Sequence, residues 1–156
     1  MDERFTIENI QAAVQNFTST QPSQEAMDFL NEWQNQPISL ISSLALVKTA
    51  DELKQKQLYS QIIKNKIADF WGQYSPEQKS QLKADLLGLL SVPNLLELPI
   101  ISFNLIYTIC QIGVYEWPQE FPEFTQIILP QPDSPTCAIS LRIFSSFLSM
   151  IWVRMF

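Results

Sequence analysis

Apolar side chains recur with the period of an α-helix through most of the chain, and the clearest pattern covers residues 51–71. There the apolar positions occupy about half of the helix circumference, and a narrow polar stripe occupies the opposite side. A helix with so wide an apolar face needs neighbours on both flanks of that face. This arrangement is typical of the inner helix of a stacked helical repeat. The apolar positions are Leu53, Leu58, Ile62, Ile63, Ile67, Phe70 and Trp71, and the stripe contains Lys54, Gln57, Gln61, Lys64 and Asn65.

The same periodicity, punctuated by prolines, predicts further helices on both sides of this one. Thr6, Ser23 and Ser75 are suited to the N-cap positions of three of them, and Pro76 is suited to a first helical turn. The chain contains 3 glycines, so glycine-dependent hairpin turns are not expected, and we predict an all-α fold. The predicted helices cover residues 6–18, 23–35, 38–49, 51–71, 76–91, 94–116, 122–129 and 136–156.

A second polar stripe follows the predicted helix 94–116, which is otherwise apolar on almost every side. For a single helix, the need for one solvated face explains such a stripe well enough. Two long helices that each carry a stripe, and that each pair with a shorter apolar helix, suggest a shared lining. The second stripe contains Glu97, Asn104, Thr108, Gln111 and Tyr115.

Helix pairs of about 40 residues stacked in one direction are typical of HEAT-like α-α superhelices. We therefore predict that residues 1–156 form one segment of a truncated solenoid, with about three antiparallel helix pairs and the start of the next. The last predicted helix is apolar on nearly every side, and the end of a solenoid needs a polar outer face. We expect the chain to be the N-terminal part of something longer, or its end to be covered by a partner.

The composition changes this picture mainly by excluding chemistry. The net charge of −6 argues against nucleic acid, which needs a basic surface. No histidine is present, which removes the commonest general base and metal ligand, and no glycine-rich phosphate loop occurs. Cys110 and Cys137 make neither a disulfide framework nor a zinc site, so we expect buried thiols. We therefore expect no enzymatic activity, no metal and no cofactor.

Two stretches are apolar enough to raise the question of a membrane span. Residues 98–117 are interrupted by Pro99 and by polar side chains, and residues 139–156 carry Arg142 and Arg154. A span needs about 20 mostly apolar residues. We expect both stretches to be helices of the protein interior, and no membrane association.

Three stretches, in this order and spacing, resemble the N-terminal region of the importin-β (karyopherin-β) superfamily, with the exportin type as the closest match. They are EAMDFLNEWQNQPISL at 25–40, LYSQIIKNKIADFW at 58–71 and YEWPQEFPEF at 115–124. In the third, Phe121 replaces the second Trp of the family's pattern. The resemblance extends over about residues 20–150. The residues of the second stretch that match the family are Ile63, Lys64, Asn65, Ile67 and Trp71.

Members of this superfamily are long superhelices of HEAT repeats that carry cargo through nuclear pores. The resemblance implies that the inner helices, here 23–35, 51–71 and 94–116, bind the small GTPase Ran in its GTP form on a concave face. It also implies work in the nucleus and the cytoplasm. Cargo proteins and nucleoporins are expected as partners only if the native chain is longer. The residues expected to face Ran are Lys54, Gln57, Gln61, Lys64, Asn104, Thr108 and Gln111.

The sequence therefore favours an N-terminal fragment or short form of an exportin-like nuclear transport receptor. Two alternatives stay open. One is a helical-repeat adaptor or scaffold without GTPase binding, and the other is a truncated product without a function. Charge reversal at Lys54 and Lys64 separates the receptor from the adaptor, because only Ran binding depends on those two cations.

Overall fold

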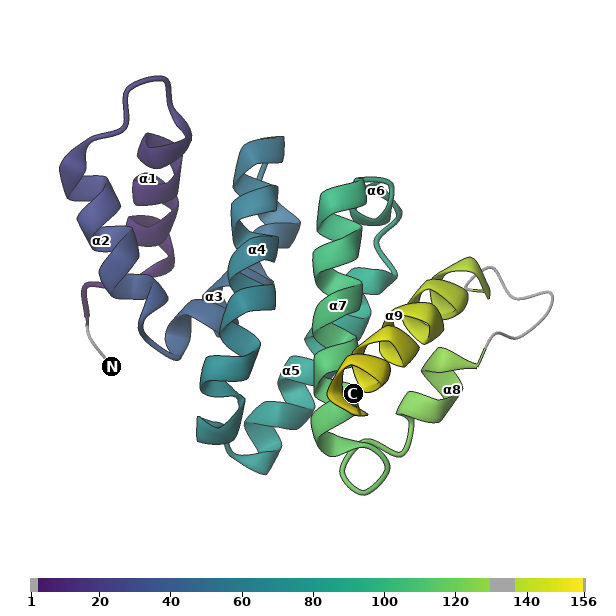
Figure 1. Ribbon diagram of the computed structural model, residues 1–156. Coiled ribbons are helices and arrows are strands. Elements are labelled where there is room, and N and C mark those ends of the chain that lie inside the picture. Colours follow the sequence, from purple (N-terminus) through teal and green to yellow (C-terminus); the bar gives the residue numbers. More distant parts are fainter. Residues whose placement is uncertain (1–2, 130–136, 156) are drawn as a thin grey trace. The chain divides into compact units, whose positions relative to one another are not determined.

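The computed structural model describes residues 3–129 and 137–155, and every regular element in these residues is a helix (Figure 1). The prediction of an all-α fold built from HEAT-like helix pairs is confirmed. The helices form two units, one ending at Leu82 and the other beginning at Lys83, and each unit has a core of its own. The prediction that the whole chain is one solenoid segment stays a prediction.

The first unit contains two helix pairs, α1 with α2 and α3 with α4 (Figure 1). Short connections join the helices of each pair, so their chain directions are opposed. The N-caps are those that the sequence predicts: the side chains of Thr6 and Ser23 accept hydrogen bonds from the backbone N–H groups of Asn9 and Ala26, both at 3.2 Å. The helices are α1 (Ile7–Thr18), α2 (Gln24–Gln34), α3 (Ile38–Thr49), α4 (Leu53–Phe70), a 3-10 turn (Trp71–Gln73) and the beginning of α5 (Pro76–Leu90).

Helices α3 and α4 make the most extensive helix contact in the described part of the chain. Helix α3 is nearly uncharged, and it buries leucines together with three serines, Ser39, Ser42 and Ser43. One of these serines, Ser42, accepts a hydrogen bond from the indole N–H of Trp33 in α2 at 3.2 Å. Helix α4 is thus fixed by α3, and α3 is in turn tied to α2.

A second tie fixes the chain just after α4. The hydroxyl of Tyr74 donates a hydrogen bond of 2.6 Å to the backbone carbonyl of Pro37, at the junction of α2 and α3. The ring of Tyr74 also meets Trp71 edge to face, with 6.5 Å between ring centroids. Burial raises the pKa of Tyr74 to about 12, so the hydroxyl keeps its proton and remains a donor over the physiological range.

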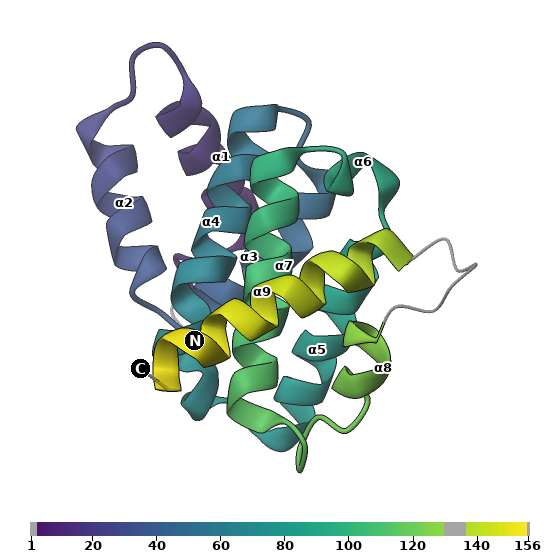
Figure 2. The ribbon, with the colours of Figure 1, turned by 45° about the vertical axis from the view of Figure 1, so that its right-hand side comes forward.

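In the second unit, α9 crosses α7 and also contacts α8 (Figures 1 and 2). Its buried Phe147 meets Phe124 of α8 edge to face, with ring centroids 4.8 Å apart. The thiol of Cys110 is buried and donates to the carbonyl of Ile143 at 3.3 Å, while the side chain of Cys137 lies outside the described residues. The helices beyond α5 are α6 (Pro93–Leu96), α7 (Pro99–Glu116), α8 (Phe124–Ile128) and α9 (Cys137–Met155).

The single helix predicted over 94–116 is wrong. Two helices, α6 and α7, occupy this stretch, and the chain turns at Glu97 and Leu98 between them. The reason is Pro99, which has no N–H to donate and fits the first position of a helix better than its interior. The predicted start of the last helix, Ser134-Pro135, lies outside the described residues.

Among residues 3–129 and 137–155, no helix is both long and apolar enough to cross a membrane.

Candidate partner-binding surface

The polar stripe predicted for residues 51–71 lies on α4, whose opposite face is packed into the first unit. Ile62, Ile63 and Ile67 are buried, as their spacing predicts. The apolar face is shorter than expected at its beginning, because Leu53 is 49% exposed and Leu58 is half-buried. The C-terminal two thirds of α4 are therefore firmly anchored, and its first turn extends into solvent.

Four of the five stripe residues of α4, those expected to face Ran, form a row of hydrogen-bond donors. Lys54 is exposed, and Gln57, Gln61 and Lys64 are half-buried, so each offers part of its side chain to solvent. The amide of Gln61 donates to Asn65 at 3.1 Å, which orients the glutamine along the helix axis. Two ammonium groups and two amides suit a polar partner surface that supplies carboxylates and carbonyl oxygens.

The predicted stripe on α7 is different from the one on α4. Asn104 and Thr108 are 1% and 0% exposed, so the expectation that they face solvent is wrong. Thr108 donates a hydrogen bond of 2.8 Å to the carbonyl of Asn104, one turn earlier in the same helix. Because the hydroxyl of Thr108 already has a hydrogen-bond partner in its own helix, it can be buried without water. The polarity of the residue therefore does not predict its exposure. Their contact with a partner stays a prediction.

Gln111, the third predicted residue of α7, is half-buried, and its Oε1 atom has no hydrogen-bond partner among the described residues. Gln111 belongs to the second unit and the α4 residues to the first. The surface shared by the two stripes, as expected from the sequence, therefore stays a prediction.

The second unit contains a buried ion pair that the sequence does not predict. The ammonium of Lys83 lies 2.9 Å from Glu116 Oε2, and their side chains are only 14% and 6% exposed. The same ammonium donates to the carbonyl of Glu120 at 2.8 Å and lies 4.9 Å from the ring centre of Phe121. The lysine thus fixes the YEWPQEFPEF stretch to α5. No local pattern connects residues 33 positions apart.

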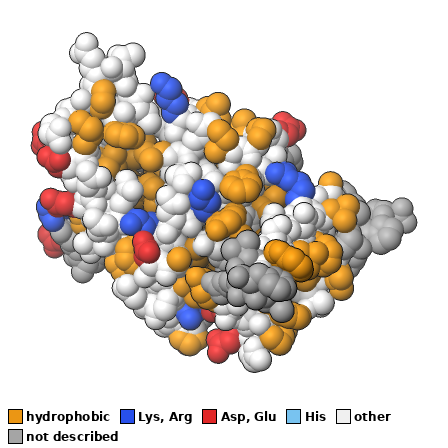
Figure 3. All heavy atoms as spheres, in the orientation of Figure 1, with side chains coloured by type: hydrophobic (Ala, Val, Ile, Leu, Met, Phe, Trp, Pro, Cys, Tyr) orange, Lys and Arg blue, Asp and Glu red, His pale blue; other side chains and the backbone are white. Residues whose placement is uncertain are grey.

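The described residues offer no group of three or more His, Cys, Asp or Glu side chains that could hold a metal ion. Lys and Arg side chains stand singly on the face drawn in Figure 3, without a continuous basic patch. On this face hydrophobic side chains gather over α7 and α9. The candidate site on α4 therefore consists of Lys54, Gln57, Gln61 and Lys64 on the partly exposed side of a packed helix.

Residues 26–92 match the family model of the importin-beta N-terminal domain. No curated protein and no solved structure matches the chain. The matched segment contains the whole of α3, α4 and α5 and nearly all of α2, with the stripe residues of α4. Asn104, Thr108, Gln111 and the 115–124 stretch lie outside it.

Proposed function

We propose that the chain belongs to the importin-β superfamily, since residues 26–92 match the model of its N-terminal domain, and that it binds Ran in its GTP form through α4. The contact residues in this proposal are Lys54, Gln57, Gln61 and Lys64. The observation that carries it is their common position: all four lie on the partly exposed side of one helix inside the matched segment. The predicted contacts of α7 lie outside that segment.

The physical support comes from the way α4 is held. Its apolar face is packed on α3, and the Tyr74 hydrogen bond fixes the chain that follows it. A partner that docks on such a helix orders only the ends of long side chains, so little conformational entropy is lost on binding. Separate cations and amides also suit recognition by electrostatic complementarity, which favours specificity and a fast association rate.

The wider role in this proposal is that of an exportin-type nuclear transport receptor, or a fragment of one. It works in the nucleus and the cytoplasm and carries out no catalysis. If binding depends on the nucleotide state of Ran, the loading and release of cargo depend on the compartment. Cargo and nucleoporins enter the proposal only for a longer native chain.

The test is a binding titration of the full chain with purified Ran, loaded either with a non-hydrolysable GTP analogue or with GDP. We expect the GTP-loaded form to bind at least about tenfold more tightly, a difference of about 1.4 kcal/mol. The double variant Lys54→Glu/Lys64→Glu should lose about tenfold or more in affinity, because the two donors become like charges facing the partner's acceptors.

The matched control is Lys48→Glu/Lys79→Glu, which makes the same change in net charge on α3 and α5 of the same unit. Its affinity for GTP-loaded Ran should stay within about twofold of the parent chain. Thermal melts of both double variants establish that each is folded. Equal binding of the two nucleotide states, or equal losses in the two variants, would overturn the assignment and leave the adaptor alternative.

A further inference from the structure

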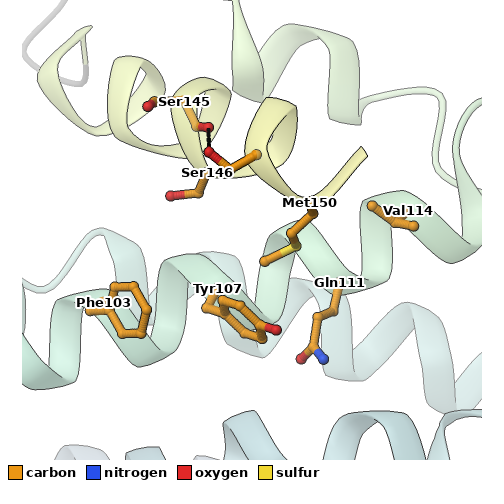
Figure 4. A pocket seen from close by; sticks show the side chains of 8 residues that line it. Phe103, Tyr107, Gln111, Val114, Ser145, Ser146 and Met150 are labelled. Atoms are coloured by element: carbon orange, nitrogen blue, oxygen red, sulfur yellow. Dashed lines mark hydrogen bonds between the residues drawn. The ribbon is translucent and has the colours of Figure 1, made fainter. Parts of the chain in front are cut away.

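The second unit contains a groove between α7 and α9 that the family match does not cover (Figure 4). Its larger hollow has a volume of about 470 Å³. A second hollow of about 310 Å³ shares Phe103, Ser145 and Ser146 with the first and ends at Leu141 and Arg142. We call the two together the α7–α9 groove. The larger hollow is lined by Phe103, Tyr107, Gln111 and Val114 of α7 and by Ser145, Ser146, Ser149 and Met150 of α9.

Large apolar side chains that line this groove are exposed to solvent. Phe103 is 51% exposed and Leu141 is 50% exposed, and both line the smaller hollow. Scattered exposed leucines are ordinary, whereas apolar residues collected around a hollow mark a binding surface.

The two helices contribute different chemistry to the groove. From α7 come the rings of Phe103 and Tyr107, with centroids 5.9 Å apart, which offer an aromatic surface. Helix α9 contributes serines, whose small side chains project only a short way into the groove. The Ser149 hydroxyl donates back to the carbonyl of Ser145 at 3.0 Å. A backbone can approach such a wall closely while its side chains reach the aromatic surface.

A single cation marks one end of the groove. Arg142 is exposed and lies beside Leu141 in the smaller hollow. Among the described side chains of the second unit it makes no ion pair, whereas Lys83 is bound to Glu116. A guanidinium presents a planar fork of donors that matches a carboxylate, and an apolar neighbour strengthens that attraction by limiting its hydration.

We propose that the α7–α9 groove is the docking site of an amphipathic helix from a partner protein, which places an apolar ridge in the two hollows and a carboxylate on Arg142. Because the hollows share Phe103, Ser145 and Ser146, they adjoin, and neighbouring apolar side chains on one face of a helix can enter both. The charge of Arg142 favours one direction of the partner helix in the groove. It also favours a partner with a carboxylate over a purely apolar one. The site does not depend on Ran or on residues 26–92.

The experiment selects peptides from a displayed library of helix-forming sequences against the full purified chain. The enriched sequences should combine apolar residues one turn apart with an Asp or Glu adjacent to them. A synthetic peptide of the enriched sequence should bind Arg142→Lys more weakly than the parent chain, because an ammonium lacks the planar fork, and should bind Arg142→Glu at least about tenfold more weakly than the parent chain. Repeating the selection against Arg142→Glu should enrich Lys or Arg at the acidic position.

Phe103→Ser should also weaken the peptide, while Phe17→Ser, which alters a 39% exposed phenylalanine of α1, serves as the matched control. Circular dichroism melts show whether each variant is folded. The proposal is overturned if no sequence is enriched, or if Arg142→Glu leaves the charge preference unchanged. It is also overturned if sedimentation shows a peptide-free dimer that Phe103→Ser dissociates, because the occupant is then a second copy of this chain.

Discussion

Single side chains decide how closely the helices of the second unit approach one another. At Gly113 of α7, an added Cβ atom would clash with two ring carbons of Phe124 in α8. Phe124 is fully buried, and its ring also contacts Phe147, so it cannot turn away freely. The glycine is required by this close approach, and its backbone conformation is an ordinary helical one.

We expect Gly113→Ala to lower the free energy of unfolding by about 1–3 kcal/mol, because the added methyl group overpacks the core. Chemical denaturation measures the change. The double variant Gly113→Ala/Phe124→Leu should recover part of the loss, since the smaller side chain leaves room for the methyl group.

Gly72 provides the matched control, because a Cβ there meets nothing within 4 Å. Gly72→Ala should be neutral or stabilise the chain by up to about 1 kcal/mol, by reducing the freedom of the unfolded chain. If both alanine variants behave alike, the close contact between Gly113 and Phe124 is not what sets the stability there.

At the scale of elements, N-caps determine where helices begin, and side-chain interactions between helices determine how they are held together. The start of α5 forms a capping box: the hydroxyl of Ser75 accepts from Gln78 N–H at 3.3 Å, and the Gln78 side chain accepts from Ser75 N–H at 2.9 Å. Hydrogen bonds from the backbone and from Ser75 lower the pKa of Glu77 in the same turn. Farther along α5, Lys83 reaches Glu116 at the end of α7.

Because this ion pair is buried, each charge relies on the other. We expect Lys83→Met to destabilise the chain by about 3–5 kcal/mol, since it leaves the Glu116 carboxylate buried without its counter-ion. The double variant Lys83→Met/Glu116→Leu should cost clearly less than the single one. Urea denaturation of the parent, both single variants and the double variant gives the coupling between them.

The exposed pair of Arg4 and Glu32, 3.0 Å apart, is the control for this cycle, with side chains 62% and 57% exposed. Its coupling should be below about 1 kcal/mol. Equal coupling energies for the exposed and the buried pair would contradict the role assigned to burial.

For the molecule as a whole, buried tyrosine hydroxyls and a buried thiol make the free energy of unfolding depend on pH in the alkaline range. Burial raises the pKa of Tyr59 and Tyr74 in the first unit, and of Cys110 in the second, to about 12 in each case. The ordinary values are 10.0 for the tyrosines and 9.0 for the cysteine. Each group holds its proton more tightly in the folded than in the unfolded chain. Stability is therefore complete below the ordinary pKa and declines as pH rises toward the folded value.

We expect the free energy of unfolding to fall from about pH 9, through the thiol, and more steeply from about pH 10, when the two tyrosines join it. Denaturation series under reducing conditions across this range measure both slopes. Cys110→Ala should remove the earlier decline, and Tyr59→Phe/Tyr74→Phe should reduce the later one. A pH profile that none of these substitutions changes would contradict the assignment.

Local sequence determined most of the helices of this protein and the faces they bury. Thr6, Ser23 and Ser75 begin their helices as predicted, because an N-cap needs only neighbours within three residues. The buried isoleucines of α4 follow from the 3.6-residue period for the same reason. The match of residues 26–92 to the importin-beta N-terminal domain agrees with the family that the local motifs suggested.

Only the tertiary structure decided features that depend on residues far apart in the chain. Asn104 and Thr108 resemble a solvated stripe in sequence, yet they are buried, because the packing around a helix decides which of its faces meets water. The Lys83–Glu116 pair, the contact of Gly113 with Phe124 and the α7–α9 groove each join different helices. Periodicity describes one helix at a time, and such contacts arise only when helices meet.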